Sequence, residues 1–123
     1  MSRPIGTLAA VSLDCPDPAV LAEFYTRLLG WEVAFSSDDF TYLAGKDFPV
    51  RLSLQRVPDH KPPSWPSPDK QFHLDLSVDS LDDAEKAIME AGGTKPEFQP
   101  GGDKWVVFQD PAGHPFCVTT FKA

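Results

Sequence analysis

The chain has 123 residues, a formal net charge of −7 and a hydrophobic content of 41%. This length and composition suit one folded domain, or two half-domains that share one core. The acidic balance argues against a nucleic-acid-binding protein, because no stripe of Lys and Arg is present to neutralise phosphates. There is also no run of about eighteen apolar residues, so we expect no membrane-spanning segment.

The cysteines and the N-terminal residues indicate the cellular compartment. Cys15 and Cys117 are too few for a disulfide framework. The N-terminus carries no apolar run of the kind that forms a signal peptide. We therefore expect a cytoplasmic protein whose thiols are reduced.

A repeated pattern relates the two halves of the sequence. Residues 71–93 predict a strand, a capped helix and a glycine stop, and residues 8–30 carry a weaker copy of this pattern. An Asp that can cap the helix lies thirteen residues before the glycine that ends it, at the pairs Asp17/Gly30 and Asp79/Gly92. The offset between the copies is sixty-two residues, half the chain, which indicates an internal duplication.

The first half predicts a strand at residues 8–14 and a helix opened by Asp17-Pro18, because Asp accepts hydrogen bonds from free N–H groups and Pro suits the first helical turn. The expected apolar face of this helix is Val20, Leu21, Phe24, Leu28 and Leu29. Three strands should follow Gly30, at residues 31–35, 40–44 and 50–57.

Residues 58–70 separate the halves. Five prolines in this stretch exclude a regular helix or strand, so we expect an extended linker. Trp65, at its middle, predicts either an anchor that packs on the protein or a lid over a ligand.

The second half repeats the order of elements. Residues 72–78 alternate strictly and predict a strand, and Ser80 with Asp83 resembles a capping box before a helix. The expected helix face is Leu81, Ala84, Ile88 and Ala91. Three strands should follow, at residues 94–98, 104–109 and 115–121.

Each half is therefore expected to be βαβββ, and the fold class α+β. We expect a single domain over residues 1–123, with half-repeats 1–57 and 71–123. The two repeats should form a curved, cup-like mixed sheet with the helices on its outer face. Alternation sends successive side chains to opposite faces of a strand, and the apolar set should face the helices.

The polar faces of the strands predict where a ligand would bind. The candidate ligand-binding residues are Arg51, Ser53, Gln55, His73, Asp75, Trp105 and Cys117. In a curved sheet these side chains would line a trough, with Trp105 and Tyr42 as stacking walls. The alternative is a plain solvated surface, which is the commonest state of one face of an antiparallel sheet.

Three segments carry a family resemblance: LDCPDPAVLAEFYTRLLGWEV, FHLDLSVDSLDDAEKAIMEAGG and WVVFQDPAGHPFCV. Together they resemble the vicinal oxygen chelate superfamily, which includes glyoxalase I, bleomycin and fosfomycin resistance proteins and extradiol dioxygenases. The chain is most similar to the glyoxalase-like domains common in actinobacteria. The resemblance implies the fold, whereas the superfamily hosts several chemistries on that fold.

The resemblance also implies where a metal would bind. Metal-using members take two ligands from each half, usually His, Glu or Gln. Those positions fall here on Ala10, on the segment around Ser53, on His73 and on Cys117, so only His73 is a standard ligand. One ligand of four cannot hold a catalytic metal, and we expect no metal and no other cofactor.

The second half offers a different ligand set. His73, Asp75 and Cys117 all offer groups that bind zinc. However, Asp75 lies two residues along its strand, about 6.6 Å from the His73 position, and Arg51 on the expected trough would disfavour a cation. We identify no catalytic residues, since no nucleophile–base pair, phosphate loop or CxxC motif is present.

We expect a metal-independent small-molecule binding protein of the glyoxalase/bleomycin resistance type, able to sequester a drug or metabolite. The alternative is a divalent-metal-dependent lyase, isomerase or dioxygenase of the superfamily. A third hypothesis is an interaction domain whose trough is only solvated. For all three we expect a homodimer, because isolated βαβββ halves expose sheet edges that a two-fold mate can cover.

Overall fold

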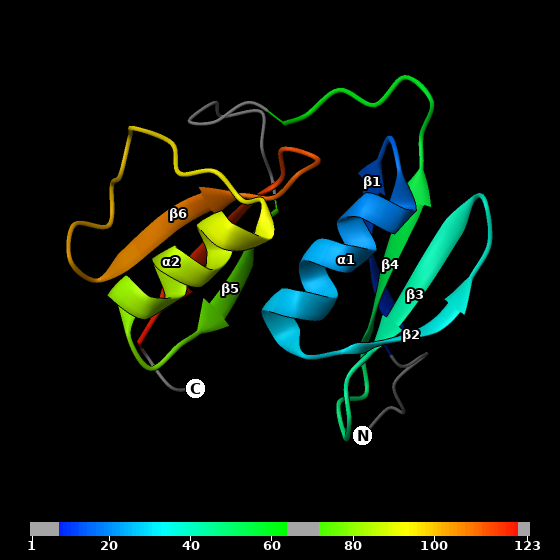
Figure 1. The fold of residues 1–123 in the computed structure, drawn as a ribbon, viewed down its shortest axis with the longest axis horizontal. Coiled ribbons are helices and arrows are strands. Elements are labelled where there is room, and N and C mark those ends of the chain that lie inside the picture. The colour runs from blue at the N-terminus through cyan, green and yellow to red at the C-terminus, as the bar shows by residue number, and fades with distance from the viewer. Residues whose placement is uncertain (1–7, 64–71, 121–123) are drawn as a thin grey trace, which may run out of the picture. The chain divides into compact units, whose positions relative to one another are not determined.

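The computed structural model describes residues 8–63 and 72–120 (Figure 1). The chain forms two compact units, Met1–Pro58 and Asp59–Ala123, which divide at the start of the proline-rich segment. Each unit contains one helix and one open mixed sheet, so the predicted α+β class is confirmed. Open sheets of this kind are also what the predicted cup requires. The single-domain boundaries stay a prediction.

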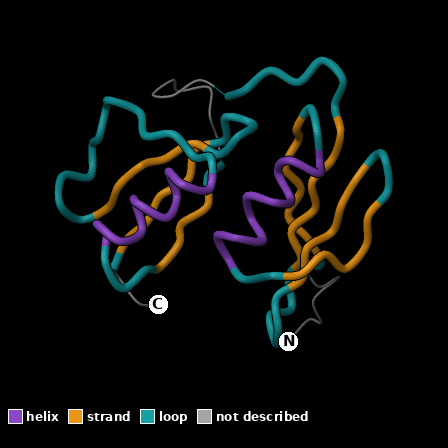
Figure 2. Tube along the Cα trace, viewed as in Figure 1, coloured by secondary structure: helices purple, strands orange, loops and turns teal. Residues whose placement is uncertain are grey.

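The first unit is a four-stranded sheet with one helix across it, as Figure 2 shows. Its elements are β1 (Ala10–Cys15), α1 (Pro18–Leu29), β2 (Glu32–Ser36), β3 (Phe40–Ala44) and β4 (Arg51–Arg56). The strand order is β1-β4-β3-β2, with β1 parallel to β4 and the other pairs antiparallel. This unit has the predicted βαβββ order.

The second unit is a three-stranded sheet, again with its helix on one face (Figure 2). Its elements are β5 (Leu74–Ser77), α2 (Leu81–Ala91), β6 (Trp105–Gln109) and β7 (Pro115–Thr119). The strand order is β5-β7-β6, with β5 parallel to β7 and β6 antiparallel to it. The last predicted strand extended to Phe121, which lies outside the described residues.

The helix ends are specified locally. Asp17 caps α1, because its carboxylate accepts a hydrogen bond of 3.0 Å from the backbone N–H of Ala19. Ser80, rather than Asp79, caps α2 by accepting from the backbone N–H of Asp83 at 3.2 Å. Both helices end at a glycine with positive φ, 70° at Gly30 and 109° at Gly92, a conformation that a side chain would strain.

The helices cover one face of each sheet, with two corrections to the predicted cores. The first core contains Leu21, Phe24, Tyr25, Leu43, Leu52 and Leu54. Val20 was predicted to belong to it, but its side chain is 51% exposed and Tyr25 is buried instead. In the second unit Phe72 was predicted to face the helix, but it precedes β5 and is 90% exposed.

The predicted strand at residues 94–98 is reduced to a single bridge between Thr94 and Gln109. Pro96 lies in this segment and has no backbone N–H to donate to a sheet. The side chain of Gln99 takes the place of the missing strand. Its amide accepts from the backbone N–H of Val107 and donates to the carbonyl of Val107, both at 2.9 Å. The outer edge of β6 is therefore closed by a side chain.

The first residues of the predicted linker are attached to the second unit. Nε2 of His60 lies 2.8 Å from the carbonyl oxygen of Ala112, in the turn between β6 and β7. The buried carboxylate of Asp110 holds this turn by accepting from the backbone N–H groups of Ala112 and His114. Trp65 lies outside the described residues, and no described helix is long and apolar enough to span a membrane.

Candidate functional site

We call the face of each sheet opposite its helix the open face. In the second unit, Leu74 and Leu76 of β5 share a face with the buried Phe116 and Val118 of β7, which packs against α2. The open face therefore carries the alternate residues. They form two rows across the strands: Asp75, Cys117 and Val107, then Ser77, Thr119 and Trp105.

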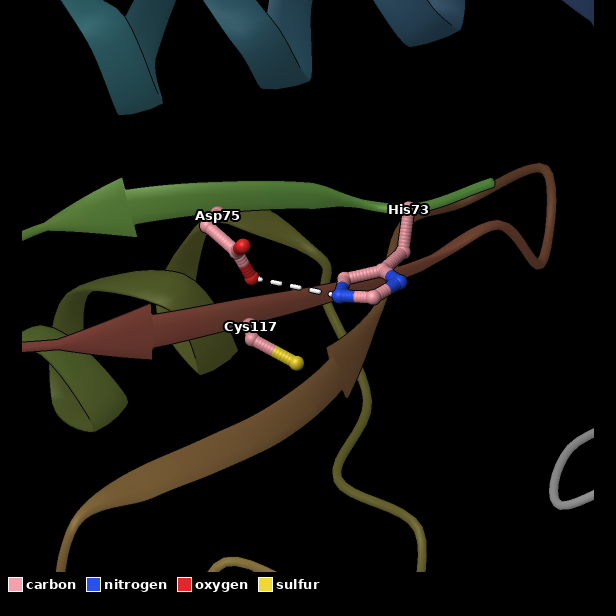
Figure 3. Close-up of side chains that lie close together, drawn as sticks. All are labelled: His73, Asp75 and Cys117. Carbon is pink, nitrogen blue, oxygen red and sulfur yellow. Dashed lines mark ion pairs between the residues drawn. The ribbon is translucent and has the colours of Figure 1, made fainter. Parts of the chain in front are cut away.

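Three side chains with metal-binding chemistry converge on this open face. Nε2 of His73 lies 3.3 Å from Oδ1 of Asp75, and one donor atom from each of His73, Asp75 and Cys117 lies within 4.8 Å of the other two. Figure 3 shows the imidazole and the carboxylate directed toward the thiol from the neighbouring strand. We call this set the donor cluster.

The members of the donor cluster differ in mobility. The side chains of His73 and Asp75 are 42% and 67% exposed, whereas Cys117 is buried in the middle of β7. An exposed side chain can change rotamer at little cost, whereas a buried one is held by its neighbours. Two adjustable donors thus face one fixed thiol.

The sequence predicts that Asp75 lies too far from His73 for both to bind one metal ion, because two residues of strand separate them by about 6.6 Å. That distance applies to the backbone, not to the side-chain tips. His73 also lies just outside β5, which begins at Leu74. Its ring and the carboxylate of Asp75 turn toward each other and close the gap to 3.3 Å.

Trp105 is a second feature of the same open face. It lies in the row next to Asp75 and Cys117, two strands from β5, and its side chain is partly exposed. The backbone of Gly101 approaches the indole so closely that a Cβ there would lie 2.5 Å from ring atom Cδ2. Trp105 is therefore held against the loop before β6, as a stacking wall requires.

The other three predicted contacts lie in the first unit. Arg51, Ser53 and Gln55 alternate in β4 with Leu52 and Leu54, which are buried beneath α1. They share the open face of that sheet, as predicted. Arg51 and Gln55 are exposed, whereas Ser53 is buried between its register partners Ser12 and Tyr42.

Sequence reasoning missed an aromatic cluster on the open face of the first unit. The rings of Phe35, Phe40 and Tyr42 have centroids 5.2–6.4 Å apart. Only Tyr42 had been expected to line the trough. The signal was available, since Phe40 and Tyr42 share one face of β3 and Phe35 is on the hairpin partner β2.

The donor cluster passes a geometric test for a divalent metal. In a tetrahedral zinc site with ligand bonds of about 2.0–2.3 Å, neighbouring donor atoms lie about 3.3–3.6 Å apart. The His73–Asp75 distance already meets this value, and the limit of 4.8 Å leaves a small adjustment to Cys117. Three protein donors also leave a fourth position for water or substrate.

The chain is an α+β protein of two units, each with a helix on one face of a mixed sheet. The profile of the Glyoxalase-like domain family matches residues 10–119, and the chain belongs to this family. The predicted relationship to the vicinal oxygen chelate superfamily is thereby confirmed. A search of curated proteins found no match.

Solved structures with the same fold are distant in sequence. A glyoxalase-related enzyme from Fulvimarina pelagi is 18% identical, with a TM-score of 0.67 over 94% of this chain and 88% of that one. A mutant of the fosfomycin resistance protein FosX from Listeria monocytogenes, complexed with Mn(II) and 1S,2S-dihydroxypropylphosphonic acid, is 13% identical, with a TM-score of 0.73 over 97% and 95%. TnmS3, an antibiotic binding protein from Streptomyces sp. CB03234, is 18% identical, with a TM-score of 0.63 over 96% and 98%.

Proposed function

We propose that the protein binds a small organic molecule on the open face of the second unit. The observation that carries this proposal is the convergence of His73, Asp75 and Cys117 one row from a partly exposed Trp105. A few convergent polar groups beside an aromatic wall are typical of small-molecule sites. Arg51, Ser53 and Gln55 remain predicted contacts from the first unit.

Two kinds of ligand group fit these side chains. The exposed carboxylate of Asp75 attracts a cationic group, and the indole of Trp105 favours a cation or an aromatic ring above its face. The net charge of −7 adds a field that favours cations over anions. We therefore expect cationic aromatic molecules to bind more tightly than small organic acids. The antibiotic binding protein TnmS3, with the same fold, supports a binding role.

Titration and thermal-shift measurements against cationic natural products and small acids test the proposal. A ligand at one hundred times its Kd stabilises the protein by about 2.7 kcal/mol and raises the Tm by several degrees. Asp75→Asn should weaken binding at least tenfold if a cationic group is recognised, which is a loss of about 1.4 kcal/mol. The matched control, Asp103→Asn in the exposed loop before β6, should leave affinity unchanged. The absence of any response across both ligand classes would refute the binding role.

The second candidate is a divalent-metal-dependent lyase, isomerase or dioxygenase. Its support is the geometry of the donor cluster, which brings together three metal-binding groups and leaves a coordination position open. Elemental analysis of protein purified without chelator or affinity tag tests it. Near-stoichiometric zinc, manganese, iron or nickel that is lost in His73→Ala would favour this candidate over metal-independent binding.

The homodimer and the cytoplasmic location remain predictions. All five residues of the edge strand β2 are exposed, including the apolar Val33 and Phe35. An exposed edge strand invites pairing with another chain, and exposed apolar side chains add to that tendency. Light scattering coupled to size exclusion should give twice the chain mass. A monomer at micromolar concentration would contradict the expectation.

A further inference from the structure

We propose that His73, Asp75 and Cys117 bind a thiophilic divalent cation, with Zn²⁺ as the expected ion, and that the second unit supplies every protein ligand. The inference rests on the second candidate function, which uses the same donor cluster, and a bound ion would take Asp75 from the organic cation of the first candidate. It differs from the superfamily pattern, which takes two ligands from each half. Here Cys117 occupies the last-strand position, and Asp75 joins from the same segment of the chain as His73.

The register of β5 and β7 builds the site. Asp75 and Cys117 are directly paired across the parallel strands, and both side chains are on the open face. His73 precedes Asp75 by two residues, so its ring reaches the same side of the sheet. Asp75 and Cys117 therefore lie at backbone positions that the sheet holds fixed, whereas His73 lies one residue before β5, and binding orders the two exposed side chains.

Charge also favours a cation at this position. Asp75 supplies a negative charge at the site, and an ion that binds Cys117 must also offset the cost of deprotonating a buried thiol beside a carboxylate. A divalent ion cancels both charges, and the imidazole of His73 supplies a neutral third ligand.

The orientation of His73 favours a metal site over a cysteine–histidine–aspartate nucleophile triad. In a cysteine–histidine–aspartate triad, the carboxylate hydrogen-bonds one ring nitrogen and the nucleophile faces the other. Here Asp75 lies against Nε2, and Figure 3 shows the other ring nitrogen turned away from both Asp75 and Cys117. One nitrogen, one oxygen and one sulfur lie within 4.8 Å of one another, close enough to bind one ion after a small adjustment.

The ligand types select the kind of metal. Thiolate and imidazole favour zinc and cobalt over magnesium and calcium, which prefer all-oxygen shells. The site should therefore discriminate strongly against Mg²⁺ and Ca²⁺. The fourth position stays open to water or to a donor atom of the organic ligand.

Cobalt substitution tests the inference on the full chain. Apo-protein prepared with a chelator is titrated with Co²⁺ in the absence of any organic ligand, and the absorption spectrum is recorded. We expect saturation at one equivalent, tetrahedral visible bands, and a thiolate-to-cobalt charge-transfer band in the ultraviolet. Competition with Zn²⁺ should abolish the cobalt bands, whereas excess Mg²⁺ should not.

Matched variants assign the ligands. Cys117→Ser should remove the charge-transfer band, and Cys15→Ser, at the other buried thiol, should retain it. His73→Ala should weaken Zn²⁺ binding more than about 100-fold, because loss of a ligand costs more than loss of an outer-shell partner. His114→Ala is its control, since His60 and His114, with ring centroids 5.5 Å apart, are the competing imidazole pair.

The outcomes are distinct. A charge-transfer band that depends on Cys117 and not on Cys15 supports the site. No binding at micromolar Zn²⁺, equal loss in both cysteine variants, or loss in His114→Ala but not in His73→Ala overturns it. Because no organic molecule is present, failure here leaves the proposed binding function untouched. Failure of the ligand screens on both apo- and zinc-loaded protein would refute that function alone.

Discussion

The two units share an order of elements but not the chemistry of their open faces. Each begins with a strand that pairs in parallel with its last strand, and each helix ends at a glycine with positive φ. The open face of the first unit carries an aromatic cluster of Phe35, Phe40 and Tyr42. The open face of the second carries the donor cluster. The duplicated scaffold is therefore preserved while the side chains that face away from the helices differ.

The units also differ in how they close a sheet edge. The first has a full fourth strand, β2, whereas the second has one bridge at Thr94 and the side-chain amide of Gln99. Both solutions give hydrogen-bond partners to the neighbouring strand. The difference shows that backbone polar groups must be satisfied at a sheet edge, but that a strand is not the only way to satisfy them.

We expect the largest effect on stability in the packed core beneath the helix, a feature that each unit has. Phe116→Ala removes a fully buried ring beneath α2 and should lower the free energy of unfolding by about 3–5 kcal/mol. Phe40→Ala, on the open face of the first unit, should cost much less because its ring is only partly buried. Urea unfolding measures both. Equal losses of stability in the two variants would contradict the distinction between the core and the open faces.

A smaller effect tests the side-chain edge of the second unit. Gln99→Ala leaves the backbone N–H and carbonyl of Val107 without the partners that they have at 2.9 Å. Each unsatisfied buried group costs about 1–3 kcal/mol, and water at the edge will recover part of this. We expect a net loss of about 1–3 kcal/mol. Gln55→Ala, an exposed glutamine in β4, is the control and should change stability by less than about 0.5 kcal/mol.

Removing the N-terminal cap of either helix should lower stability by a similar amount, because both units cap their helices with a side chain. Asp17→Ala and Ser80→Ala each remove one hydrogen bond to a free N–H in the first helical turn. Each substitution should cost about 1 kcal/mol in thermal or urea unfolding. Asp79→Ala removes the residue that the repeat had predicted as the second cap. A larger loss at Asp79 than at Ser80 would contradict the observed cap.

The smallest effect is expected at the donor cluster when no metal is present. The His73–Asp75 pair is largely exposed, and exposed ion pairs contribute about 0–1 kcal/mol. His73→Ala should therefore leave the stability of chelator-treated protein within about 0.5 kcal/mol of wild type. The same substitution should abolish any stabilisation by added Zn²⁺. A large loss without metal would indicate a structural role for His73.

Much of the fold could be predicted because its signals are local. Asp17-Pro18, Gly30 and Gly92 mark helix ends by their own chemistry, and β3 was predicted with its observed bounds. The strand predicted at residues 94–98 was wrong because Pro96 cannot donate to a sheet and the side chain of Gln99 bonds to Val107 in its place. Two caps were predicted for α2, Asp79 from the repeat and Ser80 from the capping box, and the structure has Ser80.

The candidate site was predictable only in part. Alternation placed His73, Asp75 and Cys117 on one face, and the register confirms that Asp75 and Cys117 share it. The approach of His73 to Asp75 depends on rotamers and on a strand that starts one residue after His73. Periodicity carries no information on either. The ligand positions implied by the family include His73 and Cys117 but not Asp75, which reaches the other two only through its side chain.

The central claim is that the functional chemistry of this protein lies on the open face of the second unit. Amide chemical shifts recorded by NMR during a Zn²⁺ titration test it most directly. We expect saturable shift changes at residues 73–77 and 115–119, and none at residues 10–15 or 51–56. Changes confined to β1 and β4, or no saturable change at all, would contradict it.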